Sequence, residues 1–219
     1  MKIIIIGGNG LIGKPVADYF AQKHDVIRVG RSKGDLNADL AKPETLKTLF
    51  EQTGKVDAII SIAGEAKWAP FKELSEDDFY NGIQNKLMGQ VNLVRFGRDY
   101  VKNGGSITLT TGILGEDPVP MTACAAMVNG GIHSFVKAIA MEPERGVRIN
   151  VVAPGLLEEA AEKYADYFPG HIPVSMKKVI SGYVRSVEGK VNGQLIRVLT
   201  NIKSNEVINV KDLSSGIYV

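Results

Sequence analysis

Residues 2–13 read Lys2-Ile3-Ile4-Ile5-Ile6-Gly7-Gly8-Asn9-Gly10-Leu11-Ile12-Gly13. The isoleucine run is typical of a short buried strand, and the glycines that follow at once favour a tight turn into a helix. Gly7 permits the turn, Gly10 lets the backbone approach a pyrophosphate, and Gly13 lets the helix pack closely on the sheet. The free N–H groups at the start of such a helix attract phosphates. This order of strand, glycine turn and helix predicts a dinucleotide-binding fold.

The next apolar segment, residues 26–29, bears on the choice of dinucleotide. An acidic residue about 20 positions after the glycines would bind the ribose 2′-hydroxyl of NAD. The segment ends instead in Gly30-Arg31-Ser32, whose guanidinium and hydroxyl suit a 2′-phosphate. We therefore expect NADP(H) as the cofactor, bound through Arg31 and Ser32. The alternative is that Arg31 is a solvated loop charge.

The composition is that of an ordinary globular domain. The chain has 219 residues, 44% of them hydrophobic and 23% charged, with a net charge of +2. This length suffices for one domain with a sizeable core. The charges are balanced and form no cluster of Lys and Arg of the kind that binds nucleic acid. No stretch approaches the roughly 18 apolar residues of a membrane span. Because the run at residues 3–6 is also too short for a signal peptide, we expect a soluble cytoplasmic protein that binds neither nucleic acid nor a membrane.

Metal binding is not expected. A single cysteine, Cys124, excludes an internal disulfide and a thiolate cluster. The three histidines, His24, His133 and His171, lack the close spacing of a zinc-binding helix, so we interpret them as structural.

Apolar runs alternate with longer helical patterns along the chain, which predicts a parallel sheet covered on both faces. The fold class is therefore α/β, a Rossmann-type doubly wound parallel sheet in a single domain. A cap signal at Ser75 opens the longest helix. We expect helices at 43–52, 75–102 and 122–141, and strands at 26–29, 56–62, 106–111, 147–152 and 194–199.

The binding domain is assigned to residues 1–199, and residues 200–219 form a C-terminal extension. This extension mixes the apolar cluster Val207-Ile208-Asn209-Val210 with polar residues. A flexible tail is the plainer interpretation. A further strand, or packing on a neighbouring subunit, stays open.

Other segments of residues 1–199 fit a known family. Asp39-Leu40 resembles the adenine-contacting Asp of the short-chain dehydrogenase/reductase superfamily, and Ser61–Gly64 resembles its Asn-Asn-Ala-Gly turn with the asparagines lost. Arg148–Gly155 is similar to the segment whose Pro-Gly packs beside the nicotinamide. The chain departs from the family pattern at two places. The middle glycine, Gly10, comes one position early, and the usual Gly-Gly after the last strand is missing. Together the motifs and the resemblance imply cofactor contacts from Gly7, Asn9, Gly10, Leu11, Ile12, Arg31, Ser32, Asp39, Leu40, Ala63, Gly64, Thr110, Asn129, Pro154 and Gly155.

The catalytic residues of the superfamily are mostly absent. Its chemistry depends on Ser, Tyr and Lys, with an Asn from the preceding long helix. The Asn is matched by Asn85, and Thr111 or Gly112 aligns with the Ser, whereas Ala125 and Asn129 stand at the Tyr and Lys positions. This combination resembles an atypical subgroup that lacks the usual active-site residues and has no determined function.

Proton delivery is the step that these replacements affect. A positioned general acid supplies about 10²- to 10⁴-fold in rate, and alanine can donate nothing, whereas Asn129 keeps a hydrogen bond for a ribose hydroxyl. Cys124 and Lys86 each lie one residue from a site position, and one helical step turns a side chain by roughly 100°. We therefore interpret both as turned away from the site. Asn85 and a Thr111 hydroxyl that polarises a carbonyl are the remaining catalytic candidates.

Two functions stay open. The first is an NADP(H)-binding oxidoreductase of unknown substrate with a non-standard active site. The second is a non-catalytic NADP(H)-binding sensor or partner module. Analogy at the level of the fold favours the enzyme, and the chemistry of the site favours the sensor.

Gly130-Gly131 within the helix at 122–141 bears on assembly. Each glycine costs roughly 1 kcal/mol of helix stability, which suggests the close approach of another backbone. In the superfamily this helix usually forms a subunit interface. We expect a homodimer or homotetramer.

Overall fold

Seven parallel strands form one sheet in residues 1–200, the part of the chain that the computed structural model describes. The strand order is β3-β2-β1-β4-β5-β6-β7, so the direction of winding reverses between β1 and β4. Dinucleotides bind at such a switch point, outside the carboxyl ends of the strands. The predicted Rossmann-type α/β fold is confirmed. The strands are β1 (Lys2–Ile6), β2 (Asp25–Gly30), β3 (Leu36–Asn37), β4 (Val56–Ser61), β5 (Val101–Thr110), β6 (Arg148–Pro154) and β7 (Leu195–Val198).

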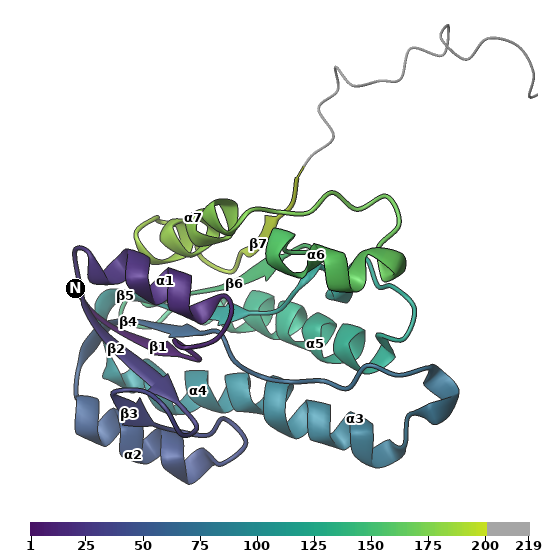
Figure 1. The fold of residues 1–219 in the computed structure, drawn as a ribbon. Helices are drawn as coiled ribbons and strands as arrows, with labels where there is room; N and C mark the ends of the chain where they lie inside the picture. The colour runs from purple at the N-terminus through teal and green to yellow at the C-terminus, as the bar shows by residue number, and fades with distance from the viewer. Residues whose placement is uncertain (201–219) are drawn as a thin grey trace, which may run out of the picture.

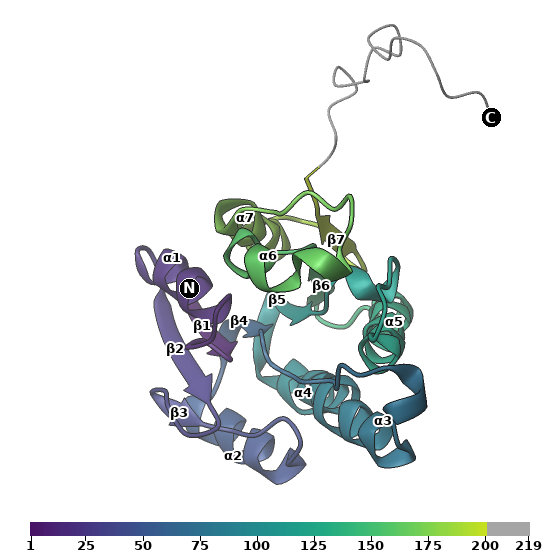
Figure 2. The same ribbon diagram turned by 45° about the vertical axis from the view of Figure 1, so that its right-hand side comes forward.

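Helices cover both faces of the sheet (Figure 1 and Figure 2). The α-helices are α1 (Gly13–Ala21), α2 (Pro43–Thr53), α3 (Glu76–Gly82), α4 (Gly89–Gly97), α5 (Ala123–Ile139), α6 (Glu158–Tyr164) and α7 (Met176–Val187). α1 and α7 pack on one face, and α2, α4 and α5 pack on the other. None of the helices in residues 1–200 is long and apolar enough to cross a membrane.

The isoleucine run of β1 is continuous because both faces of the strand are buried. Ile3 and Ile5 belong to the core beneath α1 and α7, whereas Ile4 and Ile6 belong to the core beneath α2 and α4. All four side chains are at most 2% exposed. A parallel strand covered on both sides reads as an unbroken apolar run, as the sequence predicted.

The long helix predicted from Ser75 begins as expected. Ser75 Oγ accepts a hydrogen bond from the Asp78 amide at 3.3 Å, and the Asp78 carboxylate accepts one from the Ser75 amide at 2.9 Å. This reciprocal pair is the capping box that the sequence indicated. The helix then continues from α3 through a π-helical turn, η2 (Ile83–Met88), into α4.

The strand after that helix begins five residues earlier than the predicted start at residue 106. Helical structure stops at Tyr100, and β5 begins at Val101, which pairs with Val56. The glycines at 104 and 105 therefore lie inside the strand rather than before it. A Cβ on Gly105 would lie 2.4 Å from the carbonyl oxygen of Asp57, so glycine is needed where the register between β4 and β5 shifts.

The other predicted elements agree with the structure to within two residues at most ends. The short strand β3 was missed, because two residues that pair with the end of β2 leave no apolar run to detect. The cluster at 207–210 lies outside the described residues.

Of the pair Gly130-Gly131, only Gly131 has an explanation within a single chain. A Cβ on Gly131 would lie 3.2 Å from the side chain of Leu87, and one on Gly130 would lie 3.8 Å from the carbonyl oxygen of Gly115. The missing side chain of Gly131 thus lets η2 approach α5, whereas a side chain on Gly130 would make only an ordinary contact. A subunit interface at this helix stays a prediction.

Candidate functional site

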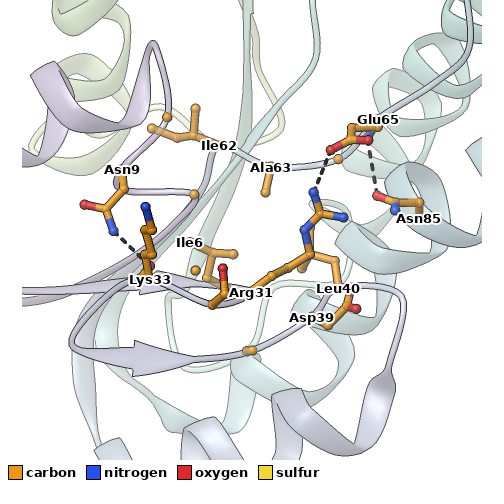
Figure 3. A pocket seen from close by; sticks show the side chains of 16 residues that line it. Ile6, Asn9, Arg31, Lys33, Asp39, Leu40, Ile62, Ala63, Glu65 and Asn85 are labelled. Carbon is orange, nitrogen blue, oxygen red and sulfur yellow. Dashed lines mark hydrogen bonds and ion pairs between the residues drawn. The ribbon is translucent and has the colours of Figure 1, made fainter.

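A pocket of about 410 Å³ lies at the carboxyl ends of β1, β2 and β4, where the sheet reverses its winding (Figure 3). It brings together predicted residues from the glycine turn, the end of β2, the segment after β3, the turn after β4 and η2. Its lining consists of Ile6, Gly7, Asn9, Gly10, Gly30, Arg31, Ser32, Lys33, Ala38, Asp39, Leu40, Ile62, Ala63, Gly64, Glu65 and Asn85.

The glycine turn has the geometry that the sequence predicted. Gly7 has a φ of +79°, which favours glycine, and a Cβ there would lie 2.2 Å from the Ile62 carbonyl oxygen. A Cβ on Gly13 would lie 1.9 Å from the Gly7 carbonyl oxygen. Gly10 differs, because a Cβ there would meet a single atom, the same oxygen, at 3.4 Å. Gly7 and Gly13 are therefore required by the turn itself, whereas Gly10 leaves open space where phosphates would approach.

Arg31 reaches across the mouth of the pocket (Figure 3). Its Nη2 donates to Glu65 Oε1 at 2.9 Å, with the two side chains 64% and 74% exposed. The Glu65 amide donates in turn to Asn85 Oδ1 at 3.3 Å. Arg31 thus lines the pocket and forms an exposed ion pair across its mouth.

Lys33 is a second cation at this end of the pocket, and sequence reasoning missed it. Its carbonyl oxygen accepts from Asn9 Nδ2 at 2.9 Å, which ties the loop after β2 to the glycine turn. Gly30 permits this loop, because a Cβ there would lie 2.1 Å from the same carbonyl oxygen. The signal was present in the sequence, since Lys33 follows directly after Arg31 and Ser32.

The opposite wall is fixed by hydrogen bonds at Asp39. Its Oδ1 accepts from the Ala41 amide at 3.0 Å, and its own amide donates to Thr45 Oγ1 at 2.9 Å. Leu40 is buried against Gly89, where a Cβ would lie 2.8 Å from the leucine Cβ. The helix carrying η2 and α4 therefore supports this wall directly.

Several predicted cofactor contacts lie outside the pocket lining. Leu11 is 58% exposed, and Ile12 packs against the core beneath α1. The Thr110 hydroxyl is hydrogen-bonded to Tyr183 Oη at 2.9 Å, on the α7 face of the sheet. Gly155 lines a separate pocket with Ile113 and His171.

Gly112, Asn129 and Pro154 meet beside the carboxyl ends of β5 and β6. A Cβ on Gly112 would lie 3.7 Å from Asn129 Nδ2 and 3.6 Å from the Pro154 carbonyl oxygen. Ala125 and Asn129 are 4% and 2% exposed. We call the group formed by Thr111, Gly112, Ala125, Asn129 and His133 the catalytic corner.

Asn129 carries an unpaired polar atom in this corner. Its Oδ1 is buried and has no hydrogen-bond partner among residues 1–200. A buried acceptor without a donor costs about 1–3 kcal/mol, so such an atom points to a missing donor. A ribose hydroxyl of a bound cofactor would supply one.

His133 is the residue of the catalytic corner that sequence reasoning assigned to structure. Its Nε2 lies 2.7 Å from Thr111 Oγ1, and both side chains are buried. Burial lowers the pKa of His133, and the charges of Lys137, Arg197 and Lys86 lower it further, against an opposing effect of Glu116. The spacing could have revealed it, because positions 125, 129 and 133 recur every four residues on one helix face.

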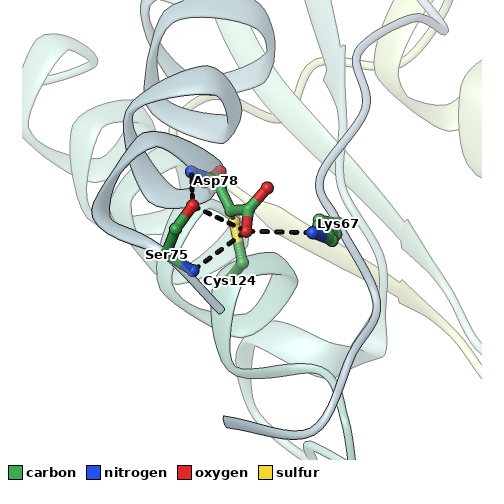
Figure 4. Close-up of polar contacts among 4 residues, drawn as sticks. All are labelled: Lys67, Ser75, Asp78 and Cys124. Carbon is green, nitrogen blue, oxygen red and sulfur yellow. Dashed lines mark hydrogen bonds and ion pairs between the residues drawn. The ribbon is translucent and has the colours of Figure 1, made fainter. Parts of the chain in front are cut away.

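Cys124 is packed against α3, as expected of a buried structural thiol (Figure 4). It is fully buried, and its Sγ donates to the Asp78 carbonyl oxygen at 3.5 Å. The Asp78 carboxylate is occupied by Ser75 and by Lys67, whose Nζ lies 3.0 Å away. Hydrogen bonds from Ser75 and Lys67 lower the pKa of Asp78.

Lys86 lies on the π-helical turn η2, and it does not line the pocket, whereas its neighbour Asn85 does. The stem of Lys86 packs on Gly64 of the pocket wall, where a Cβ would lie 2.8 Å from Lys86 Cγ. Burial lowers the pKa of Lys86 to about 8.

A family profile described as Enoyl-(Acyl carrier protein) reductase matches residues 15–187. Together with the Rossmann-type fold and the glycine turn, this match defines the class of protein, an oxidoreductase of the nicotinamide-binding kind. The chain belongs to the short-chain dehydrogenase/reductase superfamily.

Curated relatives include reductases of two kinds. The chain is 26% identical to the 3-oxoacyl-[acyl-carrier-protein] reductase of Rattus norvegicus over 193 residues, which cover 78% of this chain and 82% of the relative. It is 25% identical to hydroxynaphthalene reductase arp2 of Aspergillus fumigatus over 147 residues, or 63% of this chain. The match spans about half of the length of the latter relative, 54%.

Solved structures show the same fold. The protein lin1944 from Listeria innocua is 42% identical, with a TM-score of 0.88 over 90% of this chain and 99% of that one. A small-chain dehydrogenase solved in complex with NADPH is 24% identical, with a TM-score of 0.79 over 90% and 96% of the two chains.

Proposed function

We propose that this protein is an NADP(H)-dependent oxidoreductase with a non-standard active site, and that it belongs to an atypical subgroup lacking the catalytic Tyr and Lys. The observation that carries the cofactor choice is Arg31 at the mouth of the pocket, where a carboxylate would select NAD. Ser32 and Lys33 line the same end of the pocket. A dianionic 2′-phosphate is the ligand that such a group of donors prefers.

The residues present fit this cofactor. The open space above Gly10 accepts a pyrophosphate, and the wall at Asp39 and Leu40 accepts an adenine. The unpaired Asn129 Oδ1 supplies an acceptor for a ribose hydroxyl. When bound, the dinucleotide supplies a hydride for the reduction of a substrate. The NADPH-bound dehydrogenase of similar fold supports this assignment.

The second candidate function is a non-catalytic NADP(H)-binding sensor or partner module. It is favoured by the catalytic corner, where Ala125 has no proton to donate and Asn129 has no titratable one. Both functions predict that the protein binds NADP(H). Only the first predicts that bound NADPH is oxidised by a substrate.

Two measurements test the proposal. Calorimetry compares NADPH with NADH, and we expect NADPH to bind more tightly. Single-turnover oxidation of bound NADPH then follows a panel of carbonyl, enone and quinone substrates by absorbance. Oxidation with at least one class supports the enzyme, and tight binding without oxidation in any class supports the sensor. Equal affinity for the two cofactors overturns the choice of NADP(H).

A further inference from the structure

We propose that His171 is the proton donor of the reduction, held in place by Asp117 in a second pocket that receives a small, uncharged carbonyl compound. The inference rests on the proposed reductase function, and it names the acid and the substrate class that complete it. Its starting point is a pocket of about 270 Å³, in which a histidine and a carboxylate face each other. We call it the second pocket.

The second pocket adjoins the catalytic corner. It is lined by residues that follow β5, β6 and β7 and by part of the segment between α6 and α7. Two of its lining residues continue the backbone of the corner, because Ile113 follows Gly112 and Gly155 follows Pro154. Those two segments are in contact, since a Cβ on Gly112 would lie 3.6 Å from the Pro154 carbonyl oxygen.

The order of the strands places the second pocket beyond the reacting end of the cofactor. The cofactor pocket lies at β1, β2 and β4, the catalytic corner at β5 and β6, and the second pocket at β5, β6 and β7. A dinucleotide with its adenine at Asp39 and Leu40 and a ribose at Asn129 therefore runs along this edge of the sheet toward the second pocket. A compound bound there would meet the nicotinamide end.

Three contacts fix the imidazole of His171. Its backbone amide donates to the Phe168 carbonyl oxygen at 3.1 Å, across a turn in which Gly170 has a φ of +77°. Its ring packs edge-on against the Phe168 ring, with the two centroids 5.2 Å apart. Its Nε2 lies 3.5 Å from Asp117 Oδ2. The reacting group therefore has a defined place in the pocket, and 23% of its side chain is exposed.

The segment that carries His171 is itself anchored. Phe168 is buried in an aromatic cluster, where its ring lies 6.3 Å from that of Trp68 on the segment after β4. The chain leaves the sheet at Leu157 and returns at Val174, and these two residues pair as a parallel bridge. His171 thus stands on a closed and packed loop.

Asp117 determines which nitrogen of His171 gives up the proton. It follows the 3₁₀ turn η4 (Ile113–Gly115), and its amide donates to the Ile113 carbonyl oxygen at 2.9 Å. A carboxylate beside Nε2 keeps a hydrogen on that nitrogen. Nδ1 is then the nitrogen that exchanges a proton with the substrate, and histidine is the side chain most often used for such a transfer.

Other acids near the catalytic corner have competing engagements. The Thr111 hydroxyl is held by His133, and both side chains are buried. Cys124 is bonded to a carbonyl oxygen of α3, and Tyr183 is hydrogen-bonded on the α7 face of the sheet. His171 differs from them because it lines a pocket.

The lining of the second pocket indicates the class of substrate. Ile113, Leu156 and Ile172 give it an apolar character, which favours a substrate with an apolar chain or ring. Asp117 and His171 are the ionisable side chains among the described residues that line it. An anionic substrate would meet the carboxylate, and a cationic one would meet the imidazolium, so an uncharged carbonyl compound fits best.

The step balances with groups named here. NADPH provides the hydride, and therefore both electrons, to the carbonyl carbon of the substrate. The Nδ1–H bond of the His171 imidazolium breaks while an O–H bond forms on the substrate oxygen, and the electron pair stays on nitrogen. The neutral imidazole keeps its hydrogen on Nε2 beside Asp117 and regains a proton on Nδ1 from water.

The first test is single-turnover oxidation of bound NADPH by three probes, cyclohexanone, cyclohexenone and duroquinone. Glutamine has no titratable proton, so with a probe that the unmodified protein reduces we expect His171→Gln to be slower by about 10²- to 10⁴-fold. NADPH affinity should not change, because His171 lies outside the cofactor pocket. The matched control is His24→Gln, the same substitution beside Met1, and it should keep the rate.

Free imidazole separates a catalytic role of His171 from a structural one. His171→Ala should be as slow as His171→Gln, and added imidazole should restore part of its rate but none of the rate lost in His171→Gln. Asp117→Asn should slow the reaction less than His171→Gln. The double variant should be no slower than His171→Gln alone, because residues that act as a unit are not additive. Additive losses overturn the role of Asp117.

The second test observes the imidazole without turnover. Protein labelled with ¹⁵N-histidine and loaded with NADP⁺ is titrated with the same probe and followed by NMR. The signals missing from His171→Gln and from His24→Gln identify the two residues. We expect the His171 signals to shift and the His24 signals to stay. His171 signals that do not move at probe concentrations that saturate the single-turnover rate overturn the proposal.

The outcomes separate this proposal from the proposed function. An unchanged rate in His171→Gln overturns the role of His171 and leaves the reductase function standing. A loss in Tyr164→Phe, with none in His171→Gln, assigns the proton to that phenol and has the same result. NADPH binding without oxidation by any probe overturns the role of His171 and supports the sensor. Failure to bind NADPH overturns the proposed function and the role of His171 together.

Discussion

The cofactor pocket and the catalytic corner lie at the same edge of one sheet, yet they depend on different parts of the chain. The pocket is built from backbone, with Gly7 and Gly13 placed where any side chain would collide with a carbonyl oxygen. The corner depends on side chains, and we propose that Ala125 and Asn129 stand there at the positions of the family's catalytic Tyr and Lys. The comparison separates a region whose residues are required by folding from one whose residues are required only by chemistry.

The energetic cost of a change also differs between the pocket and the corner. A Cβ at Gly13 forces backbone to move, whereas Asn129 leaves a single unpaired acceptor in the corner. We therefore propose that cofactor binding and turnover are separable properties of this protein. The substitutions below test that separation, beginning with the change that should have the largest effect.

Gly13→Ala should damage both folding and binding. Its Cβ would stand 1.9 Å from the Gly7 carbonyl oxygen, so we expect the free energy of unfolding to fall by at least about 3 kcal/mol, the upper end of the usual cost of overpacking. NADPH affinity should fall with it. Urea denaturation and calorimetry measure the two effects.

Gly10→Ala is the matched control for that change. Its Cβ would make an ordinary contact at 3.4 Å, so the free energy of unfolding should stay within about 0.5 kcal/mol of the unmodified protein. NADPH affinity should still fall, because the methyl group occupies the space open to the pyrophosphate. Equal destabilisation by Gly13→Ala and Gly10→Ala would contradict the conclusion that the turn requires Gly13 and that Gly10 only leaves space for the phosphates.

Lys86→Met should stabilise the protein at neutral pH. Folding lowers the pKa of Lys86 from 10.5 to about 8, so the folded state disfavours the ammonium form. Between pH 8 and pH 10.5 the unfolded state binds more protons, and stability of the unmodified protein rises with pH in that window. At about 1.4 kcal/mol per pKa unit, the variant should gain up to about 3 kcal/mol at pH 7. The gain should nearly vanish by pH 10.5.

Urea denaturation at the two pH values measures this gain. A variant of equal stability at pH 7 would show that solvent reaches the ammonium and that its burial has no energetic consequence.

Sequence reasoning recovered the pocket better than the corner for a physical reason. Strand, glycine turn and helix form a local pattern, and Arg31 follows the second strand directly, so their positions could be predicted without tertiary structure. The contact between Thr111 and His133 joins a strand to a helix, and no local pattern encodes it.

The same reasoning explains the two missed features of the pocket rim. Lys33 and Glu65 lie on loops whose paths depend on contacts with the glycine turn and with Asn85. The sequence supplied their charges, and the fold supplied their proximity to Arg31.

Arg31→Ala should change the choice of cofactor without altering the corner. Loss of a charge-assisted hydrogen bond to the 2′-phosphate should weaken NADPH binding by roughly 1.5–3 kcal/mol and leave NADH nearly unchanged. The lower end is expected, because binding also displaces the bond from Arg31 to Glu65. Calorimetry on both cofactors checks this. An equal loss for NADH would place Arg31 against a part of the dinucleotide that the two cofactors share.

Glu65→Gln should have the smallest effect and the opposite sign. The carboxylate accepts from Arg31 at 2.9 Å with both side chains more than half exposed, and such surface pairs contribute about 0.2–1 kcal/mol. Without the carboxylate, Arg31 has less to give up when a 2′-phosphate arrives, so NADPH should bind up to about fivefold more tightly at low salt. High salt screens exposed charges and should shrink the gain, while NADH affinity should not move. Because glutamine keeps the length of the side chain and the backbone bond to Asn85, the comparison isolates the charge. Weaker NADPH binding by Glu65→Gln would contradict this. It would show that Glu65 contacts the cofactor directly, and that the ion pair with Arg31 does not have to open for the cofactor to bind.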